Sequence, residues 1–121
     1  MERKVIAVDF DGTLCMNKDT CNWPYLGPPN MELVSRLKRL QSEGHTLILW
    51  TCREGESLMQ AVKWCRDSCG LTFDAVNDNI EATKKFFGGN SRKICCDYYI
   101  DDKGCTPDIF YSYLNNMTLK V

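Results

Sequence analysis

The chain has 121 residues and a formal net charge of −1, because 15 lysines and arginines oppose 16 aspartates and glutamates. This length supports one ordinary hydrophobic core, so we expect a single domain over residues 1–121. No dense run of basic residues forms a strong nucleic-acid signal. The N-terminus lacks the apolar segment of a signal peptide or a membrane span, which predicts a cytoplasmic protein with no membrane contact.

Strand and helix patterns alternate along the chain. The apolar run at residues 5–8 predicts a first strand, and apolar residues at helical spacing over 29–43 predict a helix that stops at Gly44. The expected elements that follow are a strand at 46–51, a helix at about 54–69, a strand at 73–76, a weak helix at 80–87, a strand at 97–101 and a last strand near 108–111. This alternation predicts an α/β fold with three layers, in which a doubly wound parallel sheet has helices on both faces.

Two acidic pairs follow expected strands. Asp9 and Asp11 come after the first strand, and Asp101 and Asp102 come after the strand at 97–101. The carboxyl ends of parallel strands line one crevice, so both pairs can meet there, together with Thr51 at the end of another strand. Like charges this close need a cation or a shared proton, and Mg²⁺ is the natural partner of such oxygen ligands. The pattern therefore favours phosphate chemistry at a magnesium site.

The eight cysteines do not indicate a zinc site, because no two of them are spaced as Cys-x-x-Cys. Cys65 and Cys69 lie four residues apart on an expected helix, and we interpret them as small buried thiols of the core. Cys52 follows Thr51 at the expected crevice, where an exposed thiol would be open to oxidation. We assign it a passive role.

The sequence Asp9-Phe10-Asp11-Gly12-Thr13, then Thr51, a lysine and Asp101-Asp102, resembles the four ordered motifs of the haloacid dehalogenase (HAD) superfamily. The match spans nearly the whole chain. Residues 47–54 and 91–103 also resemble a branch of very small bacterial and phage members. The resemblance implies a Rossmann-like sheet of strand order 5-4-1-2-3, no cap domain, and a short squiggle and flap loop at about residues 12–28.

The resemblance also implies the chemistry. Asp9 would attack phosphorus and form an aspartyl-phosphate, while Asp11 would protonate the leaving oxygen and then activate water as general acid and base. Mg²⁺ would be held by Asp9, the backbone carbonyl of Asp11, and Asp101, with Asp102 a direct or water-mediated ligand. Thr51 would donate a hydrogen bond to a phosphoryl oxygen.

The phosphate-binding lysine has three candidates. Lys93 best matches the Ser-Arg-Lys segment of the small branch and is our choice, while Lys84 has the spacing from Asp101 seen in larger members, and Lys85 is its neighbour. Arg53 is expected to contact substrate or to pair with Glu54 or Glu56. These alternatives stay open at the level of sequence.

Our leading hypothesis is a Mg²⁺-dependent phosphohydrolase acting through Asp9. The alternative is a non-catalytic phosphate- or metal-binding regulatory module on the same fold. The substrate class expected is a phosphorylated small molecule, although a missing cap also admits a macromolecular phosphate. Trp23 and Tyr25 in the loop could stack on a base or sugar, or simply pack. Sequence does not fix the substrate or the oligomeric state.

Overall fold

The computed structural model describes residues 2–18 and 23–116. Strand and helix alternate in the predicted order up to the last element: β1 (Val5–Val8), α1 (Met31–Ser42), β2 (Thr46–Leu49), α2 (Gly55–Cys69), β3 (Ala75–Val76), α3 (Glu81–Phe87), β4 (Tyr98–Ile100) and α4 (Pro107–Asn116). Within the described part of the chain, no helix is both long and apolar enough to span a membrane.

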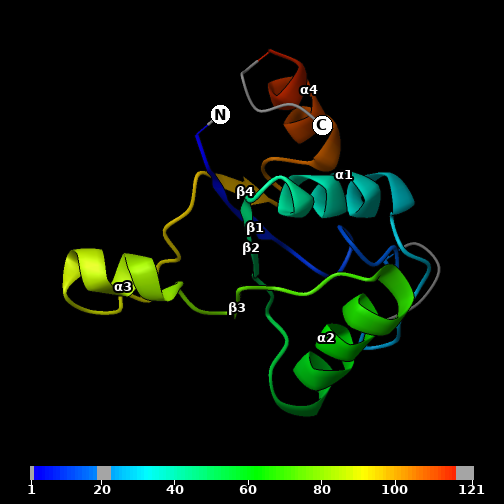
Figure 1. Ribbon diagram of the computed structural model, residues 1–121. Coiled ribbons are helices and arrows are strands. Elements are labelled where there is room, and N and C mark those ends of the chain that lie inside the picture. Colours follow the sequence, from blue (N-terminus) through cyan, green and yellow to red (C-terminus); the bar gives the residue numbers. More distant parts are fainter. Residues whose placement is uncertain (1, 19–22, 117–121) are drawn as a thin grey trace.

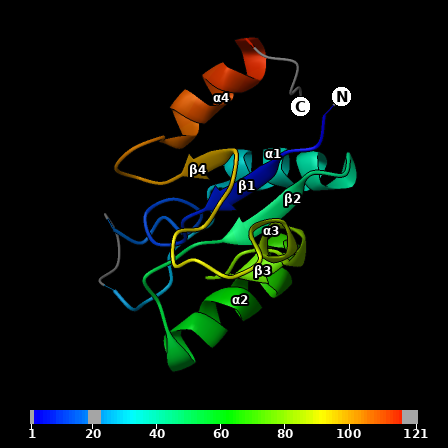
Figure 2. The ribbon, with the colours of Figure 1, turned by 90° about the vertical axis from the view of Figure 1, so that its left-hand side faces the viewer.

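The four strands form one all-parallel sheet in the order β3-β2-β1-β4. Figure 2 shows the strands running side by side, with α1 behind them and α3 in front. The result is an α/β fold with a parallel sheet, as the alternation predicted, and its layout is Rossmann-like. β1 lies between β2 and β4, so the segment after β1 is at the centre of the carboxyl edge of the sheet.

The main core lies on one face of the sheet. Alternate residues of the strands, such as Ile6, Val8, Leu47 and Leu49, pack against α1, α2 and α4, because successive strand side chains point to opposite faces. The helical contributions follow 3.6-residue spacing, with Leu33, Val34, Leu37 and Leu40 from α1, Ala61, Cys65 and Cys69 from α2, and Phe110 and Leu114 from α4. Burial of Cys65 and Cys69 confirms that these thiols belong to the core.

The expected strand near residues 108–111 is wrong, because these residues lie in α4. Pro107 suits the first position of a helix, where its missing N–H costs no hydrogen bond. Phe110 and Leu114, four residues apart, both reach the core, which is a helical spacing and not a strand one. Without this strand the described residues contain four strands, and the expected five-strand order 5-4-1-2-3 is not established.

The two faces of the sheet are covered unequally. Figure 1 shows α3 alone on the left of the sheet, away from α1 and α2. This second face has a smaller core, in which Ala7 and Ile48 pack with Ile94. No residue of α3 is buried, and Phe86 and Phe87 are 83% and 65% exposed. The expectation of helices on both faces therefore holds only through one short, loosely packed helix.

Candidate functional site

A cavity of about 490 Å³ opens at the carboxyl edge of the sheet. It is lined by the two predicted acidic pairs, by Thr51, and by residues of the loops beside them: Asp9, Asp11, Lys18, Trp23, Trp50, Thr51, Cys52, Asp101, Asp102 and Lys103. The loops that follow β1 and β4 lie on the same side of the sheet in Figure 2. The sequence prediction that these acids share one crevice is confirmed.

Asp9 follows β1 directly and is fixed by the sheet itself. Its backbone N–H donates to the carbonyl oxygen of Ile100 at 2.9 Å, which continues the pairing of β1 with β4. The buried Thr13 hydroxyl donates to Asp9 Oδ2 at 3.1 Å. Burial raises the pKa of Asp9 to about 6, and the negative charges of Asp102 and Asp11 add to this effect. Asp9 forms no ion pair with any described residue.

Gly12 shapes the turn after Asp9. Its φ of +77° lies in the left-handed region, which glycine adopts without strain. A Cβ atom on Gly12 would lie 2.7 Å from Lys18 Cδ and 3.1 Å from Asp102 Oδ2. The absence of a side chain at this position therefore lets Lys18 reach across the turn to the acidic cluster.

Asp11 is held by Arg53 in a two-pronged ion pair. Arg53 Nη2 donates to Asp11 Oδ1 at 2.8 Å, and Arg53 Nε donates to Asp11 Oδ2 at 2.9 Å. Asn17 Nδ2 donates to Oδ1 at 2.7 Å. The Arg53 side chain is fully buried, so the loss of either partner would leave the charge of the other uncompensated inside the protein. From the sequence we expected Arg53 to contact substrate or to pair with Glu54 or Glu56, and its pairing with Asp11 was not predicted.

The same two partners connect Asp11 to the loop over the cavity. Arg53 Nη2 donates to the Pro24 carbonyl at 2.9 Å, and Asn17 Nδ2 donates to the Tyr25 carbonyl at 2.9 Å. The guanidinium also lies over the Phe10 ring, 4.9 Å from its centroid. The position of Asp11 and the position of this loop are therefore coupled through Arg53 and Asn17.

The second acidic pair is arranged asymmetrically. Asp102 forms an ion pair with Lys18; partial burial opposes its ionisation, but the ammonium outweighs it and lowers the pKa of Asp102. Asp101 Oδ1 instead accepts the backbone N–H groups of Lys103, at 3.0 Å, and Gly104. Of the four acids, Asp11 and Asp102 have cationic partners, whereas Asp9 and Asp101 have none among the described residues.

Thr51 is held in place by a residue that the sequence did not single out. Asn77 Oδ1 accepts the N–H of Thr51 at 2.8 Å, and Asn77 Nδ2 donates to the Arg53 carbonyl at 3.2 Å. Asn77 has a positive φ of 51°, which asparagine tolerates better than most residues. Asn77 directly follows β3, so the segments after all four strands contribute residues to the site.

The structure does not bring Lys93 to Asp9. Lys93 lines a different cavity, on the face of the sheet that α3 covers. Lys84 is paired with Asp78 and Glu81, at 2.9 and 3.2 Å. The lysines that line the cavity of Asp9 are Lys18 and Lys103. Lys18 belongs to a loop without helical or strand periodicity, which is why the pattern did not indicate it.

The donor atoms of the cavity suit Mg²⁺, which prefers carboxylate and carbonyl oxygen. The uncompensated charge of Asp9, half-buried beside two other acids, is the observation that fits a bound cation. Among the described residues, however, no three acidic, cysteine or histidine side chains converge into a ready metal cluster. Backbone amides bind Oδ1 of Asp101, and Lys18 binds Oδ2 of Asp102, so each of these residues would ligate a metal through its other carboxylate oxygen.

A solved structure offers a comparison for nearly the whole chain. This structure, described as a conserved protein from Bacteroides thetaiotaomicron, is 39% identical in sequence, over 95% of this chain and 92% of that chain. The two folds agree with a TM-score of 0.76. No family model matches the chain, and no curated protein matches it. The description of the relative assigns no activity, so function has to be argued from the cavity.

Proposed function

We propose that this chain is a Mg²⁺-dependent phosphohydrolase of the HAD type, with Asp9 as nucleophile. The chain belongs to the same family as the conserved Bacteroides thetaiotaomicron protein. One observation carries the proposal. Asp9 lies at the centre of the carboxyl edge of the sheet, in a cavity with three further carboxylates, and has no ion-pair partner among the residues that the structure describes. An open α/β sheet binds ligands at this edge.

The chemistry follows from the positions of the side chains. The Asp9 carboxylate accepts hydrogen bonds from the Thr13 hydroxyl and from the backbone N–H of Phe10, which orient it, and it would attack phosphorus to form an aspartyl-phosphate. Thr51 offers its hydroxyl to a phosphoryl oxygen. A bound Mg²⁺, held by Asp9, Asp101, Asp102 and the Asp11 carbonyl, would offset the repulsion between the carboxylate and an anionic substrate. Transfer of the phosphoryl group to water then regenerates Asp9.

Asp11 is the proposed proton donor and acceptor, and its ion pair defines a condition for this role. In the described arrangement both of its oxygens accept hydrogen bonds from Arg53, and one also accepts from Asn17. Proton transfer requires at least one oxygen to turn toward the substrate. Because Arg53 and Asn17 also hold Pro24 and Tyr25, we expect this turn to accompany a movement of the loop.

Lys18 is our proposed phosphate-binding lysine in place of Lys93. Its ammonium lies in the acidic cavity and pairs with Asp102, so an incoming phosphate can exchange that partner for itself. We expect Lys18→Met to raise KM about tenfold or more, the scale of a lost charge-assisted hydrogen bond. Lys93→Met, the matched control, should leave KM within about twofold. Steady-state kinetics of both variants on one aryl phosphate decides between the two lysines, and the opposite ranking restores Lys93.

The experiment that tests the proposal is a phosphate-release assay across nucleotides, sugar phosphates, aryl phosphates and pyrophosphate. We expect turnover with Mg²⁺, none after chelation, and suppression by Ca²⁺, whose larger and looser coordination misplaces the nucleophile. Turnover that is unchanged in the presence of chelator contradicts the metal dependence. Absence of release from every phosphate, with the folded protein and Mg²⁺, contradicts the phosphatase itself.

One observation favours the second candidate, a regulatory module that binds phosphate or metal without turnover. The engagement of Asp11 by Arg53 withholds the acid and base that hydrolysis needs. Such a module would bind Mg²⁺ and inorganic phosphate, seen by calorimetry, and release no phosphate from any compound of the panel. The two candidates therefore differ in one measured quantity, the rate of phosphate release.

A further inference from the structure

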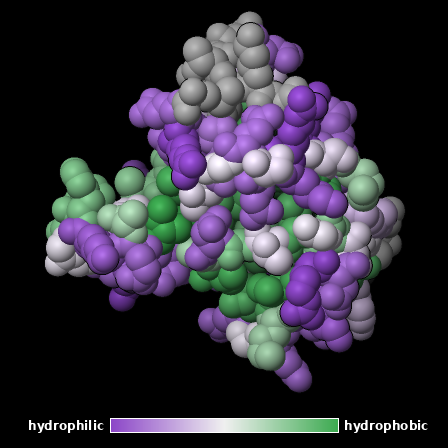
Figure 3. All heavy atoms as spheres, viewed as in Figure 1, coloured by the Kyte–Doolittle hydropathy of each residue, from purple (hydrophilic) through white to green (hydrophobic). Residues whose placement is uncertain are grey.

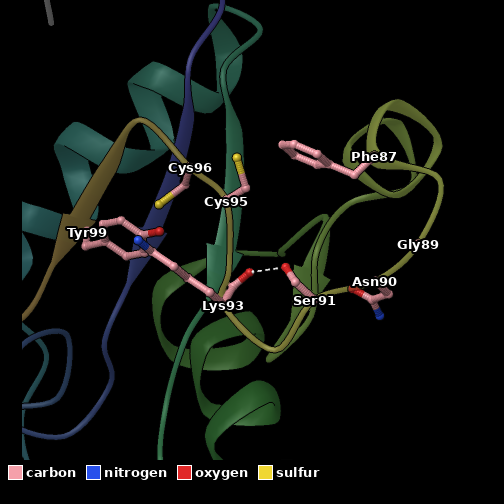
Figure 4. A pocket seen from close by; sticks show the side chains of 8 residues that line it. All are labelled: Phe87, Gly89, Asn90, Ser91, Lys93, Cys95, Cys96 and Tyr99. Atoms are coloured by element: carbon pink, nitrogen blue, oxygen red, sulfur yellow. Dashed lines mark hydrogen bonds between the residues drawn. The ribbon is translucent and has the colours of Figure 1, made fainter.

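A second cavity, of about 750 Å³, lies on the sparsely covered face of the sheet and is separate from the cavity of Asp9. Its lining combines the rings of Phe87 and Tyr99 with the side chains of Asn90 and Lys93. Figure 4 shows the Phe87 ring directed toward Cys95, and the Lys93 side chain extending toward Tyr99. A volume of this size accommodates a drug-sized ligand or a nucleotide.

The segment around this cavity carries basic side chains in two short pairs. Residues 83–96 contain Lys84, Lys85, Arg92 and Lys93 and no acidic residue, in a chain whose net charge is −1. Lys84 pairs with both Asp78 and Glu81, so this group of three side chains carries one net negative charge. Lys85, Arg92 and Lys93 are exposed and form no ion pair with any described residue. Three cations of this segment, one of which lines the cavity, therefore remain available to an anionic partner.

Exposed aromatic rings accompany these charges. Phe86 is 83% exposed and Phe87 is 65% exposed, and their rings meet edge to face with centroids 4.9 Å apart. Figure 3 shows hydrophobic atoms at the left of the molecule, where α3 lies, beside strongly hydrophilic ones. Exposed rings next to unpaired lysine and arginine are the combination with which proteins bind unpaired bases and their phosphates.

We propose that this surface, formed by Lys85, Phe86, Phe87, Arg92, Lys93 and Tyr99, binds single-stranded nucleic acid. The cations contact successive phosphates, and a base stacks in the cavity lined by Phe87 and Tyr99. A single strand is favoured over a duplex, since a duplex hides the faces of its bases. The cavity that Phe87 and Tyr99 line can take an inserted base, which is the observation that favours a nucleic acid over a lipid bilayer. The site is independent of the proposed phosphatase.

The test is fluorescence anisotropy with a labelled oligothymidylate of about a dozen nucleotides that carries no terminal phosphate. Mg²⁺ is left out, so that the acidic cavity repels the probe. We expect binding whose affinity falls with salt, with a log–log slope of about −2 for three phosphate contacts. The variant Lys85→Glu, Arg92→Glu, Lys93→Glu should lose binding. The variant Phe86→Ala, Phe87→Ala should bind at least about fivefold more weakly, the scale of lost base stacking.

The matched control is a variant of α2, Met59→Ala, Lys63→Glu, Arg66→Glu, which changes one exposed apolar and two exposed basic residues elsewhere. It should bind like the wild type, and circular dichroism should confirm that every variant is folded. The proposal is overturned if the oligonucleotide does not bind at low salt, or if the control loses as much affinity as the α3 variants. It is also overturned if thymidine monophosphate binds equally well, or if phosphatidylserine vesicles bind at this surface in preference to the oligonucleotide.

Discussion

Asp9→Asn is expected to abolish phosphate release, a loss of about a thousandfold or more, while the protein stays folded. An amide keeps the shape of the carboxylate but is a poor nucleophile. The measurement is initial rate with an aryl phosphate and Mg²⁺. The matched control is Asp67→Asn, on an exposed face of α2, which should retain the full rate. An active, folded Asp9→Asn protein would remove Asp9 from the mechanism.

The same variant is expected to be more stable than the wild type when no metal is present. Because burial raises the pKa of Asp9 to about 6 from 3.8, the folded protein keeps a proton that the unfolded chain loses between these values. The free energy of unfolding therefore falls as pH rises from about 3.8 to about 6, and the whole destabilisation by the Asp9 charge is present above pH 6. The shift corresponds to about 3 kcal/mol for a fully buried group, and solvent screening reduces it to about 1–2 kcal/mol here.

Thermal unfolding checks this expectation. Without metal near pH 7, Asp9→Asn should raise Tm by about 5 °C, and the difference should disappear below about pH 4. Added Mg²⁺ should stabilise the wild type by mass action and stabilise Asp9→Asn much less. Equal stabilisation of both proteins by Mg²⁺ contradicts Asp9 as a metal ligand, whatever the outcome for activity.

Arg53→Met is expected to destabilise the fold by about 3–5 kcal/mol. The substitution removes the cation that pairs with the Asp11 carboxylate, and the Asp11 side chain is only 16% exposed to water. The backbone carbonyls of Pro24 and Ser57 lose a donor as well. Urea unfolding gives the free energy. Arg39→Met, which breaks an exposed pair between Arg39 of α1 and the C-cap residue Glu43, should cost less than about 0.5 kcal/mol.

The double variant Arg53→Met, Asp11→Asn separates the ion pair from the packing of the arginine. Removal of both charges should recover more than about 1 kcal/mol relative to the sum of the two single variants. If the single effects simply add, the pair contributes no coupling energy, and the buried position of Arg53 has to be explained by its packing on Phe10 and its hydrogen bonds to the carbonyls of Pro24 and Ser57.

The carboxyl edge of the sheet was predictable because each acidic pair directly follows an apolar strand. Strand and acid are neighbours in sequence, so local pattern and site position coincide for Asp9 and for Asp101. The partners of these acids were not predictable in this way. Arg53 lies 42 residues from Asp11, and Lys18 lies 84 residues from Asp102. Only the folded sheet brings such pairs together, and the loop that carries Lys18 has no periodicity to guide a prediction.

The error at residues 108–111 has a different cause. Ile109, Phe110 and Tyr111 are residue types that favour strands. Pro107 and the four-residue spacing of Phe110 and Leu114 favour a helix instead, and the segment packs against the core as a helix. Lys93 was assigned by resemblance to a sequence segment. Its backbone carbonyl accepts a hydrogen bond from Asn79 at 3.3 Å, and its segment crosses the face of the sheet near Ile94 instead of ending at the acidic cavity.

The most direct test of the account is to trap the phosphoryl group on Asp9. Asp11→Asn should still accept a phosphoryl group from an aryl phosphate with a good leaving group, because departure of that group needs little acid, but should hydrolyse the intermediate slowly without its base. After an acid quench, the intact mass should increase by one phosphoryl group, located in the peptide that contains Asp9 and absent when Asp9→Asn is added. A wild-type protein that releases phosphate, combined with an Asp11→Asn protein that never carries a phosphoryl group on Asp9, would contradict the mechanism.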